Sequence, residues 1–303
     1  MAKSRDRGWP ADPEPLPLPV VDNHTHLESV ADVLPDGEPV PSVDEHVRRA
    51  AAVGVDRMVQ VGCDLPSARL TAELVREHPA LVGAVAIHPN EATLHGGVTE
   101  VGPDGLVPSP QARHAIGLDA AVAEIADLAR ANDRIRAIGE TGMDLFRTGP
   151  AGADVQRASF RAHVALAKEL GLPLQIHDRD AHAEVLEVLR TDGAPERTVF
   201  HCYSGDVEMA RYCAEQGWYL SFAGPLTFRA NDHLRAALAT VPLSQVLVET
   251  DAPYLTPHPH RGRPNAPYLL PLTVRTVAEV TGTPLHEVCR QVSVSSEDVY
   301  GPW

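Results

Sequence analysis

A short apolar run that ends in a histidine or a carboxylate recurs along this chain and limits the folds open to it. Short apolar runs flanked by segments of helical spacing are typical of parallel strands that are buried on both faces. We expect eight such strands. The first starts at about residue 20, and the other seven span residues 57–62, 81–87, 136–140, 173–176, 198–200, 218–222 and 246–250.

Segments with helical spacing alternate with these runs. We expect helices at 44–53, 66–77, 118–131, 154–170, 181–189, 207–216, 231–239, 267–280 and 284–299. Eight strand and helix units favour a closed (β/α)₈ TIM barrel over an open doubly wound sheet, and ~250 residues suffice for one barrel. No G-x-G-x-x-G motif follows the first strand, so a dinucleotide-binding fold has little support.

The predicted domain organisation is a single barrel with two additions. Residues 1–19 are rich in proline and predict a flexible tail, residues 20–303 form the barrel, and 95–115 form a surface loop insertion. The chain has no run of 18 apolar residues and no signal-like segment, so we expect no membrane span. The four cysteines are widely spaced, which favours a reducing, cytoplasmic location.

The first run is Val20-Val21-Asp22-Asn23-His24-Thr25-His26. Side chains two positions apart on a strand point to the same face. His24 and His26 therefore present two imidazoles that can hold one divalent cation. Two solvated histidines would explain this pair alone, so the prediction depends on the other strand ends.

The other strand ends carry His88, Glu140, His177, His201 and Asp251. The carboxyl ends of barrel strands face one mouth, where active sites of this fold lie. Taken singly, a strand-end histidine is often a hydrogen-bonded rim residue, and Glu140 or Asp251 can serve a turn. Taken together, imidazoles and carboxylates without thiolates suit Zn²⁺, Mn²⁺, Fe²⁺ or Mg²⁺. The set exceeds the three or four ligands of one catalytic metal, which favours two ions sharing a carboxylate.

Six ordered motifs make the chain recognisable over residues 20–300. The motifs are Asp22 to His26, Ile87-His88-Pro89, Ile138 to Asp144, Ile176 to Ala181, Phe200 to Gly205 and Glu249 to Leu255. With these motifs the chain resembles the TatD family of metal-dependent deoxyribonucleases, within the larger amidohydrolase-like group of barrels.

The resemblance implies two divalent metal ions, Mg²⁺, Mn²⁺ or Zn²⁺, as cofactors. It implies that one ion is held by His24, His26, Glu140 and Asp251, and the other by Glu140, His177 and His201. Glu140 and Asp251 would be catalytic, and His88, Arg179 and Arg261 would bind substrate. The implied reaction is hydrolysis of phosphodiester bonds by a deoxyribonuclease or exonuclease, acting on a DNA end or another phosphodiester without an obligatory protein partner.

The chain departs from the family pattern in three places. It has Asn265-Ala266-Pro267 where the family usually has Asn-Glu-Pro, its last helix has Ser293 to Ser296 in place of the usual Asn, and the 95–115 insertion is long. None of these departures falls on a predicted metal ligand, so they bear on substrate choice.

Two other functions stay open. One is an amidohydrolase-type hydrolase of amides, lactones or small phosphoesters, although such relatives bridge their metals with a carboxylated lysine where this chain has Glu140. The net charge of −15 opposes broad wrapping of nucleic acid around the protein. We therefore expect DNA to contact the protein only through the end of a DNA strand, at the predicted mouth of the barrel. The other alternative is a non-catalytic metal-binding barrel, against which the intact ligand set argues.

Overall fold

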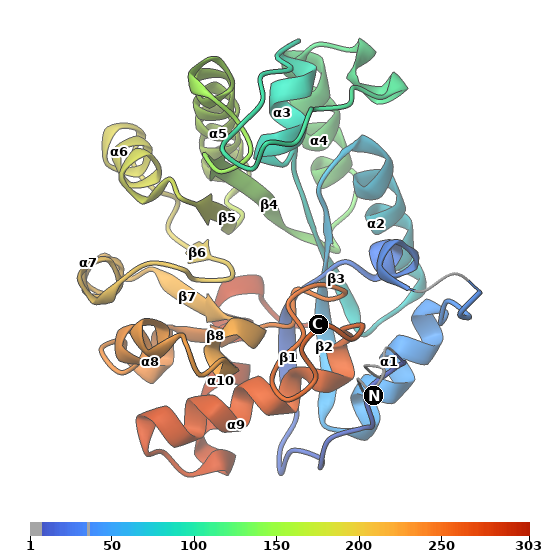
Figure 1. Cartoon of the computed structure of the whole chain (residues 1–303), viewed down its shortest axis with the longest axis vertical. Coiled ribbons are helices and arrows are strands. Elements are labelled where there is room, and N and C mark those ends of the chain that lie inside the picture. Colours follow the sequence, from blue (N-terminus) through green and yellow to red (C-terminus); the bar gives the residue numbers. More distant parts are fainter. Residues whose placement is uncertain (1–7, 35–36) are drawn as a thin grey trace, which may run out of the picture. The chain divides into compact units, whose positions relative to one another are not determined.

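A computed structural model describes residues 8–34 and 37–303, and strands alternate with helices along this part of the chain (Figure 1). The strands are β1 (Val20–Thr25), β2 (Val55–Gly62), β3 (Leu81–Val85), β4 (Ile135–Asp144), β5 (Leu174–Arg179), β6 (Thr198–Phe200), β7 (Tyr219–Phe222) and β8 (Val246–Val248). They follow the chain order in one eight-stranded sheet, and the recorded pairings are parallel. The fold class is therefore the predicted (β/α)₈ TIM barrel.

The helices follow the strands in the same order, from blue to red in Figure 1. The α-helices are α1 (Val43–Ala52), α2 (Leu65–Glu77), α3 (Pro89–His95), α4 (Leu118–Arg130), α5 (Pro150–Leu170), α6 (His182–Asp192), α7 (Val207–Glu215), α8 (Asp232–Leu238), α9 (Leu270–Thr281) and α10 (Leu285–Tyr300). Short 3₁₀ helices are η1 (Leu27–Val33), η2 (Ala112–Ala115), η3 (Gly224–Thr227), η4 (Leu243–Gln245) and η5 (Pro267–Leu269). None of the described helices has both the length and the hydropathy needed to cross a bilayer.

The helix ends follow local sequence signals. Ser42 and Glu45 form a capping box at the start of α1, and Asp64 and Ser67 form one at the start of α2. Gly171, with a φ of 63°, ends α5 where the sequence predicts a stop. These caps satisfy backbone groups that a helix end would otherwise leave without partners.

Three local features differ from the sequence expectation. β4 continues to Asp144 rather than ending at Glu140, because its last residues still pair with β5. The third strand ends at Val85, and the short helix α3 begins soon afterwards at Pro89. A helix of about two turns is too short to give a clear period in the sequence. The 3₁₀ helix η1 likewise lies between the first expected strand and the expected helix at 44–53, where no helix was expected.

The chain divides into two compact units, which are described separately. The terminal unit comprises Met1–Gln60, Gly205–Asp298 and Pro302–Trp303, and the central unit comprises Val61–Ser204 and Val299–Gly301. Two of the boundaries fall within β2 and within α10, one falls in the loop between β6 and α7, and one follows α10. In the central unit α5 packs along β4, and in the terminal unit β1 contacts β8.

The N-terminal segment makes specific contacts in the terminal unit from residue 8 onward. The Leu16 amide donates to the Val53 carbonyl at 3.0 Å, and the Pro10 carbonyl accepts from the Tyr268 hydroxyl at 2.8 Å. The side chain of Arg263 donates to the carbonyls of Gly8 and Trp9. Residues 1–7 of the predicted tail lie outside the described residues, and the flexibility of the tail stays a prediction.

The 95–115 segment is fastened to the central unit by its own polar side chains. Glu100 accepts from the Ala151 amide at 3.0 Å and so caps the first turn of α5. Arg113 contacts Glu91 at 2.7 Å and Asp64 at 3.1 Å. The segment also leaves large apolar side chains exposed, among them Val107 at 78%.

Candidate metal centre

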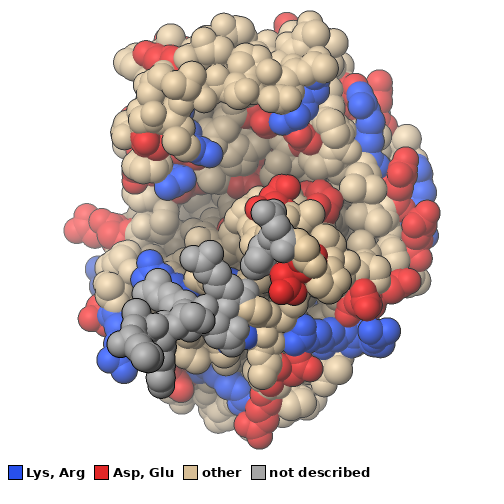
Figure 2. Space-filling model, turned by 45° about the vertical axis from the view of Figure 1, so that its right-hand side comes forward, with Lys and Arg blue, Asp and Glu red and all other residues tan. Residues whose placement is uncertain are grey.

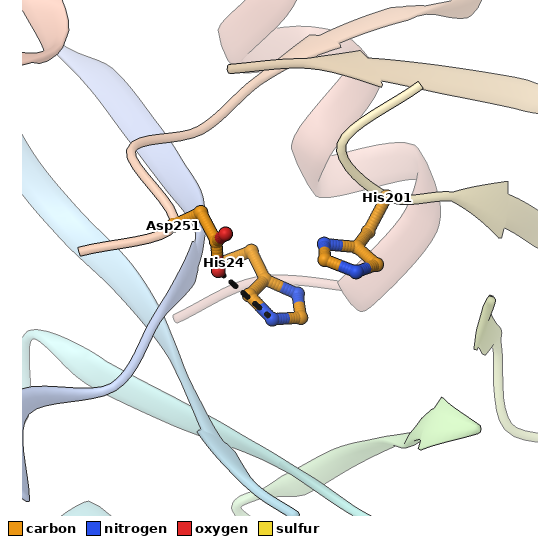
Figure 3. Close-up of side chains that lie close together, drawn as sticks. All are labelled: His24, His201 and Asp251. Atoms are coloured by element: carbon orange, nitrogen blue, oxygen red, sulfur yellow. Dashed lines mark ion pairs between the residues drawn. The ribbon is translucent and has the colours of Figure 1, made fainter. Parts of the chain in front are cut away.

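The terminal unit brings together His24, His26 and Asp251. The two Nε2 atoms of His24 and His26 lie 3.1 Å apart, as expected for residues two positions apart on one strand face. Asp251 Oδ1 lies 3.5 Å from His26 Nε2 and 3.9 Å from His24 Nε2, the second ion pair being drawn in Figure 3. Two imidazoles and one carboxylate therefore converge here.

Backbone hydrogen bonds fix Asp251 beside β1. Its amide donates to the His24 carbonyl at 2.9 Å, and the His26 amide donates to the Ala252 carbonyl at 2.7 Å. Asp251 itself has a φ of 52°, in the left-handed region that few residues other than glycine, Asn and Asp occupy. The backbone thus turns sharply at Asp251 and keeps its carboxylate beside both imidazoles.

Asp22, buried in β1, holds the residue that precedes Asp251. Its Oδ1 accepts from the Thr250 amide at 2.9 Å, and its Oδ2 accepts from the Thr250 hydroxyl at 2.5 Å. Burial raises the pKa of Asp22 to about 7, although the hydrogen bonds from Thr250 lower it. Asn265 adds a hydrogen bond from its side-chain amide to the Thr250 carbonyl at 2.9 Å. These contacts secure the loop that carries Asp251.

The central unit gathers its ligand-type side chains around one carboxylate oxygen. Glu140 Oε1 lies 2.5 Å from His177 Nδ1, 2.8 Å from His201 Nε2 and 3.4 Å from His88 Nε2. His177 lies within β5, His201 directly follows β6, and His88 is the N-cap of α3. Each of these side chains is at most 17% exposed.

Two glycines let β4 approach β5 closely on either side of Glu140. A Cβ on Gly139 would lie 2.4 Å from the Gln175 Cβ, and one on Gly142 would lie 2.0 Å from the His177 carbonyl oxygen. Gly142 also has a φ of 143°, which favours glycine. The Ile138-Gly139-Glu140-Thr141-Gly142 sequence therefore sets how near Glu140 and His177 can come.

The electrostatics of the central cluster favour an ionised Glu140. Burial alone raises its pKa, but the charges of His201 and His88 and the hydrogen bond with His177 outweigh burial and hold the pKa well below its usual range. Burial alone lowers the pKa of His177, but hydrogen bonds with Asp144 and Glu140 raise it to about 9. The protein therefore offers a buried carboxylate that stays charged at neutral pH.

Asp144 orients His177 from the far side of its ring. Asp144 Oδ2 lies 3.3 Å from His177 Nε2 and accepts from the Asn90 side-chain amide at 3.1 Å. Gln156 accepts from the Asp144 backbone amide at 2.8 Å and fixes this end of β4. A histidine that binds a metal usually donates its other ring N–H to a carboxylate, and Asp144 is placed for that role.

His88 is arranged as a hydrogen-bond donor. Its Nδ1 accepts from the Asn90 amide at 3.1 Å and caps α3, so the hydrogen that the ring can donate is on Nε2. His88, Glu140 and His177 also lie within metal-ligating distance of one another. Because Nε2 carries the hydrogen, we assign His88 to donation rather than to metal binding.

Both clusters fit divalent cations by the chemistry of their donors. The terminal unit offers two ring nitrogens and a carboxylate, and the central unit offers a charged carboxylate with the ring nitrogens of His177 and His201. Borderline and hard divalent ions prefer this mixture of nitrogen and oxygen. The central cluster also contains Asp144 Oδ1, which is buried without a hydrogen-bond partner.

The two predicted substrate-binding arginines each lie over an aromatic ring. The guanidinium carbon of Arg179 is 4.2 Å from the Phe146 ring centroid in the central unit, and that of Arg261 is 4.5 Å from the Phe228 ring centroid in the terminal unit. No described contact joins either guanidinium to a ligand-type side chain of its own unit. Their role in substrate binding stays a prediction.

Three residues of these clusters were given no role from the sequence. Asp22 and Asp144 lie within the recognised motifs, but their partners Thr250 and His177 are known only from the structure. The Cys63 thiol donates to Glu140 Oε2 at 3.3 Å. Cys63 directly follows β2. A search for ligand-type side chains after every strand, including this one, would have identified it from the sequence.

Comparison with known proteins assigns the family. Residues 21–301 match the family described as TatD related DNase. The chain belongs to the TatD family. A metal-dependent hydrolase named TatD from Mycobacterium tuberculosis is 42% identical over 286 residues, which cover 93% of this chain and 98% of that protein. The chain is accordingly a metal-dependent hydrolase of the TatD type.

Two further TatD relatives bear on function and on fold. A protein of Erwinia tasmaniensis named 3'-5' ssDNA/RNA exonuclease TatD is 29% identical, over 85% of this chain and 93% of that protein. The crystal structure of the TatD homologue YJJV from Escherichia coli has a TM-score of 0.77 at 22% identity, covering 94% of this chain and 98% of that one. This structural likeness supports the barrel fold.

Proposed function

We propose that this TatD-type hydrolase is an exonuclease that removes nucleotides from the end of single-stranded DNA by hydrolysing phosphodiester bonds. The proposal depends on the environment of Glu140. His177 and His201 both contact Glu140 Oε1, and the carboxylate stays ionised. Amidohydrolase-type relatives with other substrates use a carboxylated lysine at this strand end, and this chain has a carboxylate of its own.

Two ions would be held by the predicted ligands. The carboxyl ends of barrel strands open onto one mouth, so we assign both clusters to one catalytic centre. His24, His26, Glu140 and Asp251 would hold one ion, and Glu140, His177 and His201 the other. When bound, such ions lower the pKa of water toward ~7 and neutralise phosphate oxygens.

The chain's own residues would supply proton transfer and orientation. Asp251 would accept the proton of the attacking water through its carboxylate, as a general base. His88 would donate its Nε2 hydrogen to a non-bridging phosphate oxygen, since Asn90 already occupies its Nδ1. Asp144 would hold the His177 ring in a fixed orientation during turnover.

Single-stranded ends are the substrate that the surface favours. Acidic and basic side chains are interspersed over the face in Figure 2, without one broad basic area among the described residues. The net charge of −15 would repel a long duplex held along the surface. The Erwinia tasmaniensis relative is named for action on single-stranded nucleic acid. All four cysteines are free thiols, and we also propose that the protein works in the cytoplasm.

The test is metal reconstitution followed by product analysis. Protein stripped of metal is loaded separately with Mg²⁺, Mn²⁺ and Zn²⁺, its metal content is measured, and end-labelled single-stranded DNA is digested beside a panel of amides, lactones and aryl phosphates. We expect two ions per chain and stepwise shortening of the DNA. Hydrolysis confined to the amide or lactone panel would overturn the nuclease proposal. Full metal loading without hydrolysis of any substrate would favour a non-catalytic barrel.

A further inference from the structure

Five of the ten arginines described in the terminal unit are engaged by carboxylates or carbonyls, and two of the other five lie in the strand-end loops. Arg49, Arg57 and Arg235 form ion pairs, and Arg263 donates to backbone carbonyls. Arg229 and Arg261 are exposed, and among the described residues neither guanidinium has a hydrogen bond or an ion pair. These two cations are available to an anionic ligand.

Phe228 contacts Arg261 and directly precedes Arg229 in the chain. The guanidinium carbon of Arg261 lies 4.5 Å from the Phe228 ring centroid, and Arg229 is the next residue along the chain. Arg229 also lines a cavity of ≈ 520 Å³, whose other charged or ionisable lining residues are Arg235, Arg275, His258, Asp232 and Glu279. A guanidinium that lies over an aromatic ring can direct its N–H donors outward, parallel to the ring, where they can bind phosphate oxygens.

The loops that carry these residues are fastened to each other. A Cβ on Gly224 would lie 1.9 Å from the Leu255 carbonyl oxygen, so the loop after β7 packs directly on the loop after β8. The His258 amide donates to the Thr227 hydroxyl at 2.8 Å. The arginines are therefore presented by a braced surface rather than by two independent loops.

An exposed aromatic ring lies at the other end of the β8 loop, beside the predicted ligands. Tyr254 is 43% exposed, and its ring centroid lies 6.2 Å from that of His26. It follows Asp251 by three positions, and the Tyr254 amide donates to the Asp251 carbonyl at 2.9 Å. An exposed ring at this position can stack on a nucleobase whose phosphate lies at the metal ligands.

We infer that the loops after β7 and β8 form a track for a single DNA strand, an inference that rests on the proposed nuclease function. Tyr254 stacks on the terminal base, and Arg261, Phe228 and Arg229 bind the phosphates and bases that follow. Alternation of aromatic rings with cations is the usual means of holding a single strand without reading its sequence. The paired strands of a duplex hide the base faces that Tyr254 and Phe228 would contact.

The experiment compares oligothymidylates of two and twelve nucleotides with phosphorothioate ends on the metal-loaded protein. The double variant Arg229→Ala/Arg261→Ala is matched with Arg211→Ala/Arg290→Ala, which removes two exposed arginines from α7 and α10. We expect the first variant to weaken binding of the twelve-mer at least tenfold, and much less for the dinucleotide. The slope of log K against log salt should fall by about 1.4, since each single-strand phosphate contact contributes about 0.7.

Tyr254 is tested with a strand that lacks its terminal base. Tyr254→Ala should weaken binding of the normal twelve-mer by about tenfold, Tyr254→Phe should restore it, and neither should change binding of the strand with an abasic end. Equal effects of the two arginine double variants, or equal effects of Tyr254→Ala on both strands, would overturn the track while leaving the nuclease proposal standing. Wild-type protein that shortens DNA shows that the nuclease function holds, and wild-type protein that neither binds nor shortens it contradicts both proposals.

Discussion

The two ligand clusters hold their carboxylates in different ways. Asp251 of the terminal unit lies in a loop, 3.5 Å or more from the ring nitrogens, and backbone hydrogen bonds to β1 fix its position. Glu140 of the central unit lies within β4 and contacts His177 and His201 at 2.5 and 2.8 Å. The first carboxylate is positioned by the backbone, and the second by charge.

This difference indicates how each cluster should respond to substitution. Removal of Glu140 removes the one negative charge that faces three imidazoles. Substitution near Asp251 should instead act through the loop that carries it. The central cluster should therefore be more sensitive to charge, and the terminal cluster more sensitive to hydrogen bonds that fasten the loop.

The largest effect is expected for Glu140→Ala, which we predict lowers turnover of single-stranded DNA by at least ~10³-fold. The volume-matched Glu140→Gln should lose nearly as much, because it lacks the charge that attracts two cations. Metal content should fall together with activity. A Glu140→Gln protein that keeps most of its turnover would contradict the bridging role.

Asp144→Asn tests whether the Asp144 carboxylate orients the His177 ring, and this substitution should have the next largest effect. Loss of a carboxylate that orients a metal-binding histidine typically costs ~10–100-fold in metal affinity or activity. The matched control is Asp192→Asn in α6, which breaks only the ion pair with Arg161. Metal titration should show weaker binding for Asp144→Asn alone, and equal affinities for both variants would argue that Asp144 does not orient the ligand.

Thr250→Val tests whether the hydrogen bond between Thr250 and Asp22 positions Asp251 in the terminal unit. Loss of the hydroxyl leaves Asp22 Oδ2 without its 2.5 Å hydrogen bond inside the protein, at a cost of ~1–3 kcal/mol of unfolding free energy. We expect about tenfold weaker metal binding, with recovery in Thr250→Ser. Chemical denaturation and metal titration measure the two effects. A destabilised variant with unchanged metal affinity would show that Asp22 and Thr250 stabilise the fold without positioning Asp251.

The smallest effect concerns His163, a buried histidine of the central unit that binds no ligand. Its Nε2 accepts from the Ile87 amide, and burial lowers its pKa to about 4. The unfolded chain, with an ordinary histidine pKa near 6.5, binds a proton that the folded protein does not. Stability due to neutral His163 is therefore present above pH 6.5 and is lost as pH falls toward 4, by ~3 kcal/mol.

His163→Gln should flatten this part of the pH dependence and leave metal affinity unchanged at pH 7. His46 offers the comparison in the terminal unit, because burial lowers its pKa to about 4 as well. His46→Gln should flatten the same range of pH. Denaturation curves between pH 4 and 7 that are parallel for wild type and both variants would contradict this account.

The alternation of strands and helices could be predicted from the sequence, because burial of both strand faces requires continuous apolar runs. Most strand and helix positions agree with the structure to within a few residues, and the barrel fold is confirmed. Candidate ligands followed from the same pattern, since each stands at the end of an apolar run. Within each unit the structure brings the predicted members together, around Glu140 Oε1 and around the rings of His24 and His26.

The supporting contacts required the tertiary structure. Asp22 meets Thr250 across 228 positions of the chain, and Cys63 meets Glu140 across 77. No local pattern encodes such pairs, because each depends on which strands become neighbours and how closely glycines let them approach. From the sequence one can therefore predict which ligand-type residues stand at the strand ends. The tertiary structure decides which of their atoms face one another, which nitrogen of His88 can donate a hydrogen and which arginines stay available to a substrate.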